Sequence, residues 1–592
     1  EHTAQLNVKT AKECQKKFKD KKINILSCST TFEMGVDIGG LETVFMRNVP
    51  PTPANYVQRA GRAGRRDDSS AFVLTFCGNT SHDYTYFENP DKMISGEIKP
   101  PKFKITNEKI ILRHLLATAF GMFFRANSQY FKNVDNLVCN GGIKEFKQFL
   151  LSRPDDLNNF INHKVLDRDT YDKYSDYKWL DCLSQNGDYL DNFEKSIIDL
   201  ISQFDSAKED AIKSDILDKA TYYQSQIRKV KSGGVIENLS KYNVIPKYGF
   251  PVDVVDLQIW NNGQLDDEYD LSRDLSIAIS EYAPDSEVIV DKKKYTSKYI
   301  TLPKTSPFTK YYYFNCNHCE RDNISEINES LNKCCYCGTE NDETVINYFI
   351  EPIYGFKTGI TKESSTKKPK KTYAGSVSYI GNGVCDDNKI VLGNDYMSVE
   401  SSSDDELLIM NKNPFYMCNT CGFSKIMKGH PEIQVYSETH LNFKGRKCSD
   451  DRIHLLSLGH KFKTDVVKIS IKNIDKRNKA LSLLYALLEG ISQEFSIERR
   501  DIDGVVVKNS FNSYDLIIYD NVPGGAGHVK RIVDKKMLIA TLCLAMEKVK
   551  QNCCDENSSC YNCLRNYNNQ TYHKELKRSF AIEALNEILN NI

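Results

Sequence analysis

The sequence predicts a mixed α/β protein built from several structural units. Three observations support this: strands alternate with helices near the N-terminus, a long stretch with helical spacing follows, and cysteine pairs recur in the second half. A chain of 592 residues has room for about three to five domains of roughly 100–200 residues. We therefore expect a partial parallel-sheet domain, a helical insert, and cysteine-rich β and α/β regions.

Residues 1–92 have the pattern of parallel β-structure. Apolar runs typical of strands occur at 23–28, 43–46 and 71–76, and helical patterns occur at 11–19 and 53–65. Strands that alternate with helices pair in parallel as βαβ units, so we predict a parallel sheet here.

The rest of the chain divides into three predicted parts. Apolar residues at helical spacing predict a helical bridge or insert over 93–241. Short β-type runs, such as 286–291, predict a mixed β region over 242–410. Residues 411–592 form the predicted C-terminal domain, which ends in a strand at 516–519 and a helix over 529–550.

Two polar segments are predicted to be flexible loops. One is the basic stretch 362–371 and the other is the acidic stretch 401–406.

Composition limits the function classes. The 79 basic and 79 acidic residues balance, so a phosphate-binding surface must be local rather than global. Seven lysines crowd into residues 9–22, either as such a surface or as a solvated helix face. The sequence contains no run of about 18 apolar residues, so no membrane-spanning helix is predicted. The 19 cysteines, without an export signal, predict a reducing, cytoplasmic location.

The most specific local pattern is YVQRAGRAGRR at residues 56–66. Arg59, Arg62 and Arg65 recur every three residues, so on a helix they stay near one face. Planar, permanently charged guanidinium groups suit phosphoryl transfer, where negative charge develops on phosphate oxygens. The glycines allow the backbone to approach a ligand closely. The alternative is a basic helix that faces solvent.

The first cysteine cluster has the spacing of a zinc ribbon. Cys316 and Cys319 form one Cys-x-x-Cys pair, and Cys334 and Cys337 form a second one. Four thiolates from two such pairs close a tetrahedral structural site. The adjacent Cys335 is predicted to be a bystander, because Cys334 gives the usual register of the pair.

The second cluster is looser in spacing. Cys418 and Cys421 form a pair, and His440 and Cys448 complete a set of three cysteines and one histidine. His454 is an alternative to His440. We expect a zinc site here too.

The third cluster combines Cys553, Cys554, Cys560 and Cys563. Adjacent cysteines ligate one metal only with strain, so either Cys553 or His573 is the weaker fourth ligand. Redox-active thiols are the alternative to zinc, since Cys560 and Cys563 form a Cys-x-x-Cys pair. Closed ligand sets leave no position for an activated water, so none of the three sites is expected to be catalytic.

A glycine turn, DNVPGGAGH at residues 520–528, follows a predicted strand and opens a helix. Such a turn holds a phosphate through free N–H groups, or serves only as a tight, close-packed connection. We favour the connection, and no dinucleotide-binding fingerprint is present.

The arginine-rich string resembles motif VI of superfamily-2 helicases, and STTFEMGVD at residues 29–37 resembles their motif V. The resemblance implies part of a second RecA-like domain. It implies that Arg62 and Arg65 reach the ATP γ-phosphate and that Gln58 lies near the nucleotide. The remaining residues implied at the nucleotide and DNA sites are Arg59, Gly35 and Asp37 for the nucleotide, and Thr30 and Thr31 for a DNA phosphate.

The C-terminal region resembles the four-cysteine domain of MrfA-like helicases. The likeness rests on the glycine turn, on SCYNCLRNYNN at 559–569, and on residues 573 and 576–578; segments 247–251 and 273–284 are similar as well. It implies an ATP-dependent DNA helicase or translocase that moves 3′ to 5′ on single-stranded or tailed DNA, in repair or phage defence. ATP, Mg²⁺ and Zn²⁺ are the implied cofactors.

A Walker A loop and Mg²⁺-binding carboxylates of a first RecA-like domain are absent from the sequence. We therefore expect the chain to be inactive as an ATPase alone, and to work with a first RecA-like domain in the same or a neighbouring chain. The alternative is a non-catalytic zinc-ribbon module that binds nucleic acid and retains a relic motor domain. A thiol oxidoreductase is a third hypothesis, and it predicts no bound zinc.

Overall fold

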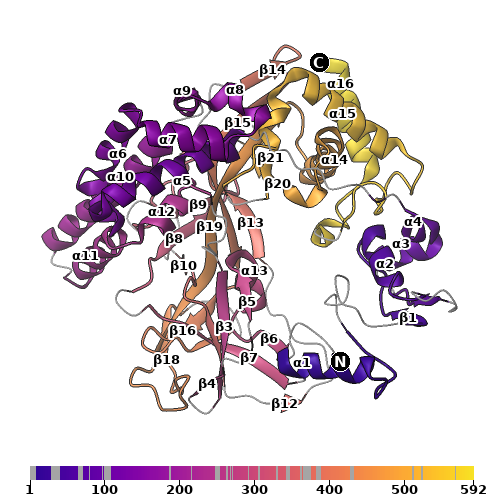
Figure 1. The fold of residues 1–592 in the computed structure, drawn as a ribbon, viewed down its shortest axis with the longest axis horizontal. Helices are drawn as coiled ribbons and strands as arrows, with labels where there is room; N and C mark the ends of the chain where they lie inside the picture. Colours follow the sequence, from indigo (N-terminus) through magenta and orange to yellow (C-terminus); the bar gives the residue numbers. More distant parts are fainter. Residues whose placement is uncertain are drawn as a thin grey trace.

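A computed structural model describes the chain from residue 8 to residue 592 with gaps. The segments outside the described residues are 1–7, 29–40, 65–70, 79–80, 97, 99–107, 186–188, 215–216, 247–253, 262–263, 267–268, 270, 291–292, 304–306, 328–330, 342–346, 360–362, 365–374, 382–388, 412, 427–432, 510–511, 522–523 and 567–568. A tall central β-structure stands between two groups of helices, and the N-terminal part lies beside the C-terminal group (Figure 1).

The described residues between 41 and 78 contain a parallel βαβ unit. Strands β1 (Thr43–Met46) and β2 (Phe72–Thr75) pair in parallel, and α2 (Pro53–Ala60) connects them. This confirms the parallel pairing that the alternating pattern predicts. The other helices of this part are α1 (Val8–Lys19), α3 (Ser81–Glu88) and α4 (Asp91–Ile94).

Two predicted elements of this part are wrong in extent. Helix α2 ends at Ala60 instead of reaching residue 65, because the chain turns at Gly61 and adopts a left-handed conformation at Gly64 (φ +72°). A Cβ atom at residue 64 would lie 2.7 Å from the Cβ of Ala71, so the turn also needs glycine for close approach. The apolar run 23–28 does not form an extended strand: within it only Cys28 takes part in a β-bridge, and the Ile25 side chain is 86% exposed.

The region predicted to be a helical insert is helical. Its core contains the fully buried Trp179 and a stacked ring pair, Phe120 and Phe146, with centroids 3.7 Å apart. Burial of such aromatic side chains is the main force that holds short helices together. The α-helices are α5 (Glu108–Ala126), α6 (Gly142–Leu151), α7 (Asp155–Phe160), α8 (Arg168–Tyr174), α9 (Lys178–Gln185), α10 (Tyr189–Lys213), α11 (Leu217–Lys231) and α12 (Val235–Lys241).

The smaller of two mixed sheets follows the helices. Within the described residues its strand order is β12-β7-β11-β3-β4, with β5 on β3 and β6 on β7. Helix α13 (Leu275–Glu281) packs against it. The strands are β3 (Val254–Asn261), β4 (Gln264–Asp266), β5 (Ser272–Asp274), β6 (Glu287–Val290), β7 (Lys293–Ile300), β11 (Phe356–Thr358) and β12 (Glu363–Ser364).

The larger sheet is organised around one long strand, β19 (Arg452–Ile471). It pairs antiparallel with β15, β16, β18 and β21 and parallel with β10, so it runs through the middle of the molecule (Figure 1). Its partners and their neighbours are β8 (Tyr311–Asn315), β9 (Asp322–Ser325), β10 (Asn347–Ile350), β13 (Gly375–Tyr379), β14 (Lys389–Leu392), β15 (Met397–Asn411), β16 (Phe415–Met417), β17 (Ser424–Ile426), β18 (Val435–Ser437), β20 (Ile502–Lys508) and β21 (Tyr514–Asp520).

The acidic segment 401–406 is not the flexible loop that its composition predicts. It lies within β15, where the pairing register with β19 shifts between Ser402 and Asp405. Such a shift accommodates extra residues in a strand. The Asp405 carboxylate is buried and accepts a hydrogen bond of 2.6 Å from the Tyr379 hydroxyl, so the acidic side chain has a partner inside the sheet. The sheet also runs across the predicted boundary at residue 410, and the domain division stays a prediction.

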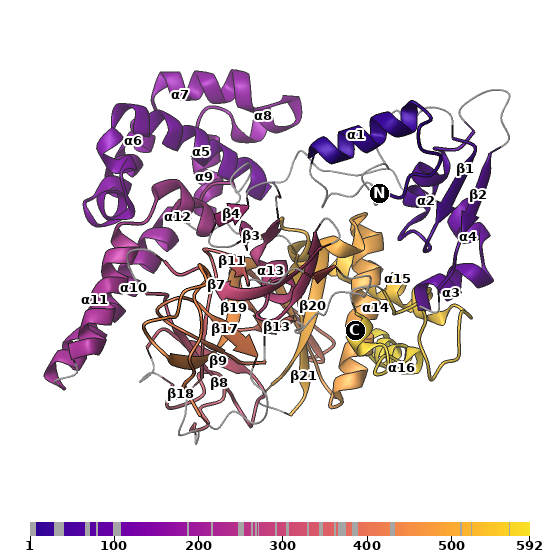
Figure 2. The ribbon, with the colours of Figure 1, turned by 90° about the horizontal axis from the view of Figure 1, so that it is seen from below.

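Three helices cover the C-terminal end of the sheet on the side away from the helical insert (Figure 2): α14 (Arg477–Phe495), α15 (Lys535–Lys550) and α16 (Arg578–Asn591). Their apolar side chains, together with those of β15, β19 and β21, form the largest apolar cluster in the described part of the chain. The single helix predicted over 529–550 is two elements, a short 3₁₀ helix (Val529–Val533) and α15. Asp534 separates them, because its carboxylate caps α15 through the N–H groups of Lys536 and Met537.

Candidate functional site

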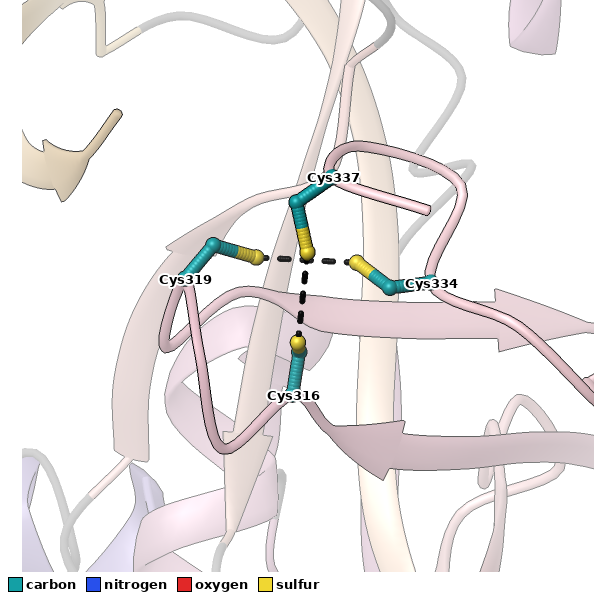
Figure 3. A group of neighbouring side chains, drawn as sticks. All are labelled: Cys316, Cys319, Cys334 and Cys337. Atoms are coloured by element: carbon teal, nitrogen blue, oxygen red, sulfur yellow. Dashed lines mark hydrogen bonds between the residues drawn. The ribbon is translucent and has the colours of Figure 1, made fainter. Parts of the chain in front are cut away.

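The first cysteine cluster brings four sulfur atoms together at one end of the large sheet. All four side chains point toward a common centre (Figure 3), and the sulfur atoms lie within 4.8 Å of one another. The Sγ atoms of Cys316 and Cys337 are 3.6 Å apart, and those of Cys319 and Cys334 are 3.5 Å apart. Zinc–sulfur bonds of about 2.3 Å at tetrahedral angles place sulfur atoms about 3.8 Å apart, so this donor set fits Zn²⁺.

The backbone of both pairs has the same turn. The N–H group of Glu320 donates to the carbonyl of Cys316 at 2.8 Å, and that of Gly338 donates to the carbonyl of Cys334 at 2.9 Å. Glu320 and Gly338 both have positive φ, 58° and 73°. Cys335 is exposed and is not one of the four convergent residues, in line with the bystander role expected for it.

An arginine anchors this cluster to the sheet. The Arg321 guanidinium lies over the Tyr336 ring, 3.3 Å from its centroid, and donates to the carbonyl of Gly381 at 2.8 Å. The Tyr336 hydroxyl donates to the neighbouring carbonyl of Ile380 at 2.7 Å. Burial raises the pKa of Tyr336, so this hydroxyl keeps its proton. The sequence gives no signal for these contacts, since they depend on residues that are distant in the chain.

The second cluster joins three cysteines and a histidine. The Sγ atoms of Cys418 and Cys448 are 3.9 Å apart, and Cys421 Sγ lies 3.3 Å from Nε2 of His440. All four ligand atoms lie within 4.8 Å of one another. A tetrahedral zinc site with one imidazole has sulfur–nitrogen separations of about 3.6 Å, so this set also fits Zn²⁺.

The surroundings of His440 fix which ring nitrogen faces the cluster. Its Nδ1 lies 2.8 Å from the carbonyl oxygen of Glu438, and a carbonyl only accepts hydrogen bonds, so Nδ1 carries the proton. Nε2 is then left with its lone pair toward the sulfurs. The ring stacks on Phe423 with centroids 4.7 Å apart. His454, the alternative ligand, is not in the convergent group.

The third cluster is formed by four cysteines near the start of α16. The sulfur–sulfur distances are 4.0 Å for Cys553 and Cys554, 3.8 Å for Cys554 and Cys563, and 3.8 Å for Cys560 and Cys563. All four sulfurs again lie within 4.8 Å of one another. Cys553 is therefore in position to be the fourth ligand. These distances fit a tetrahedral zinc site.

Two side chains surround this third cluster. Nε2 of His573 contacts the Asn566 carbonyl oxygen at 3.1 Å and the Asn569 amide oxygen at 2.9 Å, so it is directed away from the sulfurs. Arg578 is only 2% exposed, and its Nη1 lies 3.7 Å from Cys553 Sγ. Four thiolates around Zn²⁺ carry a net charge of −2, and a buried guanidinium offsets part of it. The sequence alone does not place Arg578 at this site.

The third cluster also contacts the N-terminal part. The Tyr561 ring, between Cys560 and Cys563 in sequence, packs edge-on against His82 of α3 with centroids 5.9 Å apart. On its other side it packs against His573 at 5.6 Å. The third cluster is thus in direct contact with the N-terminal part of the chain, which carries the arginine-rich string.

The residues predicted to bind nucleotide and DNA are described only in part. Gln58 lies exposed on α2, and Arg59 is half-buried on the same helix. Arg62 is half-buried in the turn after α2, where its N–H group donates to the Arg59 carbonyl at 3.2 Å. The helix face expected to hold Arg59, Arg62 and Arg65 together is therefore interrupted. The predicted residues outside the described part of the chain are Thr30, Thr31, Gly35, Asp37 and Arg65.

The glycine turn is a packed connection. Oδ2 of Asp520 accepts hydrogen bonds from the N–H groups of Ala526 and His528, at 2.7 and 3.0 Å, and Oδ1 accepts one from Val529 at 3.0 Å. Burial and the neighbouring Asp465 carboxylate raise the pKa of Asp520 to about 6. The N–H groups that a phosphate would use are thus already bonded to a carboxylate, which favours the structural interpretation.

Comparisons with known families match both ends of the chain. Residues 1–67 match the helicase conserved C-terminal domain, and residues 483–564 match the MrfA Zn-binding domain. The chain is therefore similar to a helicase C-terminal domain near its N-terminus and to an MrfA Zn-binding domain near its C-terminus. The second match includes the glycine turn and the third cysteine cluster, and together with the three clusters it supports Zn²⁺ as a cofactor.

Curated relatives extend the likeness beyond these two domains. Druantia protein DruE of Escherichia coli (strain UMEA 4076-1) is 25% identical over 640 aligned positions, which cover 96% of this chain and 34% of DruE. The uncharacterized ATP-dependent helicase YprA of Bacillus subtilis (strain 168) is 29% identical over 102 positions, 17% of this chain and 14% of YprA. This chain thus spans about a third of the length of DruE.

Among solved structures, the crystal structure of the DUF1998 helicase MrfA bound to DNA aligns with 98% of this chain and 56% of that chain. The TM-score is 0.48 and the sequence identity is 12%.

In the part of the chain that the structure describes, no helix is long and apolar enough to cross a membrane.

Proposed function

We propose that this chain is the second RecA-like half and the accessory zinc-binding region of an ATP-dependent DNA helicase or translocase. The observation that carries the proposal is the helicase C-terminal match on residues 1–67, which includes β1 and α2 of the parallel βαβ unit, with Gln58 on α2 and Arg62 in the turn after it. A parallel unit of this kind places its loops at one edge, where nucleotides bind in open α/β sheets.

In the proposed mechanism, Arg62 and Arg65 stabilise charge on the ATP γ-phosphate from across a cleft between two RecA-like domains. Gln58, Arg59, Gly35 and Asp37 would contact the nucleotide. A guanidinium contributes to phosphoryl transfer because it is always charged and offers paired donors. ATP and Mg²⁺ are held jointly with a first RecA-like domain, either in the same polypeptide or in a neighbouring one.

DNA is the proposed substrate, as a single strand or a tailed duplex, with movement from 3′ to 5′. Thr30 and Thr31 would contact its phosphates. Repair and phage defence are the proposed settings, since the C-terminal residues 559–569 resemble those of MrfA-like helicases. The three cysteine clusters would bind structural Zn²⁺ through closed ligand sets, because each of them provides four convergent ligand atoms.

The test uses the full-length protein with both RecA-like domains. Arg62→Ala should abolish DNA-stimulated ATP hydrolysis and leave DNA binding within about twofold of wild type. Lys92→Ala is the matched control, because Lys92 is an exposed cation on the nearby helix α4. Wild-type turnover by the Arg62 variant would refute its role.

Strand displacement then separates a motor from a non-catalytic module. A duplex with a 3′ single-stranded tail should be unwound with ATP, and a duplex with a 5′ tail should not. The wild type could instead bind the 3′-tailed and 5′-tailed duplexes equally without ATP, displace no strand and hydrolyse no ATP. That result would favour the zinc-ribbon module with a relic motor domain.

A further inference from the structure

A basic and aromatic surface lies next to the second cysteine cluster, outside the proposed motor. We name it the Phe443 surface and define it by the following residues: Trp260, Lys357, Phe443, Lys444, Arg446 and Lys447. The smaller sheet contributes the first two, and the loop between His440 and Cys448 contributes the rest. Strands β3 and β4 lie at the end of the molecule opposite to helices α14–α16 (Figure 1).

The loop of residues 441–447 is held in one conformation. Its ends are bridged as a short antiparallel pair at Leu441 and Lys447. Inside it, the N–H group of Asn442 donates to the Arg446 carbonyl at 2.8 Å, and the Asn442 side-chain oxygen accepts from the N–H groups of Lys444 and Arg446, at 3.0 and 3.1 Å. The loop also connects His440 and Cys448, two ligands of the second cluster, so its conformation does not depend on a bound partner.

Cations are concentrated on this surface. Lys444, Arg446 and Lys447 are exposed, and residues 441–447 contain no acidic side chain. Two ion pairs lie near the loop in the described residues, Lys425 with Glu438 and Arg452 with Asp450. Both are formed by residues outside the loop. Three exposed cations within four residues repel one another, and a polyanion relieves that repulsion.

Aromatic rings are interleaved with these cations. The Phe443 ring is half-buried and packs edge-on against Trp260 with centroids 4.8 Å apart. The Lys357 ammonium lies 4.0 Å from the centroid of Phe443. Burial and the nearby Lys444 ammonium lower the pKa of Lys357. Rings beside a track of cations are the arrangement with which proteins bind single-stranded nucleic acid: cations contact phosphates and rings stack on bases.

We propose that the Phe443 surface is an accessory binding site for single-stranded DNA. Lys444, Arg446 and Lys447 contact successive phosphates, and Phe443 with Trp260 supplies the ring surface for a base. The choice of DNA as the nucleic acid rests on the proposed function. The binding itself does not depend on ATP, so this site and the motor can be tested separately.

The experiment measures binding of the full-length protein to fluorescein-labelled oligo-dT of about 30 nucleotides by fluorescence anisotropy. It is done without nucleotide at several salt concentrations. Each phosphate contact on a single strand contributes about −0.7 to the slope of log affinity against log salt. The triple variant Lys444→Gln/Arg446→Gln/Lys447→Gln should therefore have a slope less negative by about 2. A second variant, Phe443→Ala, should bind about fivefold to 100-fold more weakly with an unchanged slope, because it loses stacking only.

The matched control replaces three exposed lysines of the helical insert, namely Lys144→Gln, Lys164→Gln and Lys195→Gln. It should retain the wild-type affinity and slope. Zinc content equal to wild type shows that each variant is folded around the second cluster. A wild-type slope and affinity for the triple loop variant would overturn the proposal. If the wild type does not hydrolyse ATP, or if hydrolysis does not depend on Arg62, the proposed motor is refuted. This binding result is then unaffected.

Discussion

Nζ of Lys109 lies 2.5 Å from Oδ1 of Asp465, and both side chains are buried although 356 positions separate them in sequence. The other oxygen of Asp465 accepts a hydrogen bond from the N–H group of Gly527 at 2.9 Å. One turn further along α5, Arg113 donates to the carbonyl of Gly524 at 2.5 Å. The helical insert, the central strand β19 and the glycine turn therefore meet at one buried charged contact.

Lys109→Met should weaken this junction strongly. The substitution leaves the Lys530 ammonium, 4.0 Å away, as the remaining cation beside the buried Asp465 carboxylate, and removal of one partner of a buried pair costs up to about 3–5 kcal/mol. We expect faster amide hydrogen exchange in α5 and in β19 near Asp465, together with a lower urea midpoint. The control Lys17→Met breaks an exposed pair with Glu13 on α1 and should change neither. Wild-type exchange in α5 of the Lys109 variant would contradict a structural role for the pair.

The first cysteine cluster provides its own matched pair of variants. Cys337→Ser should remove one zinc ion per chain and unfold the ribbon locally, because a structural zinc site contributes folding free energy directly. Cys335→Ser should keep the full zinc content, since Cys335 is exposed and outside the cluster. Zinc per chain is measured by elemental analysis after dialysis. Equal zinc loss from both variants would show that the register of the pair is different.

The second cluster distinguishes two histidines. His440→Gln should lower the zinc content by up to one ion per chain, because Nε2 of His440 faces the sulfurs of the cluster. His454→Gln should leave it unchanged. The measurement is zinc release on titration with a chelator, which also reports weakened binding that survives dialysis. Earlier release from the His454 variant than from the His440 variant would reverse the assignment.

The parts of the fold that the sequence predicts are those encoded by neighbouring residues. The parallel unit of β1 and β2 follows from alternating apolar runs, and the first cluster follows from two Cys-x-x-Cys pairs whose turns form locally. Helical spacing likewise predicts the insert. In each case the pattern lies within a short stretch of sequence, or it is a residue spacing, such as Cys-x-x-Cys, that is typical of one kind of structure.

The parts that the sequence does not predict depend on distant partners. Asp405 reads as a loop residue, yet the Tyr379 hydroxyl and a register shift hold it inside β15. Arg578 reads as an ordinary basic residue, yet it is buried against Cys553. The composition of a segment shows how many charges it carries, but not which distant residue compensates each of them.

Glu351 provides a prediction about pH. Burial alone would raise its pKa, but the hydrogen bond and charge of His460 and the ammonium groups of Lys241 and Lys461 outweigh burial and lower the pKa from 4.5 to about 2. A lowered carboxyl pKa stabilises the folded state above about pH 4.5, and this contribution is lost as the pH falls toward 2. Its full size is on the order of 3 kcal/mol.

Glu351→Gln should therefore be less stable than wild type at pH 6.5, and the difference should shrink as the pH falls below about 4.5. The measurement is the urea midpoint of both proteins from pH 6.5 to 3.5. Zinc content is measured at each pH, and the two proteins are compared only where both retain it. Glu145→Gln, at an exposed position on α6, is the control and should follow the wild-type curve. A difference that stays constant over the whole range would mean that the Glu351 charge does not stabilise the fold.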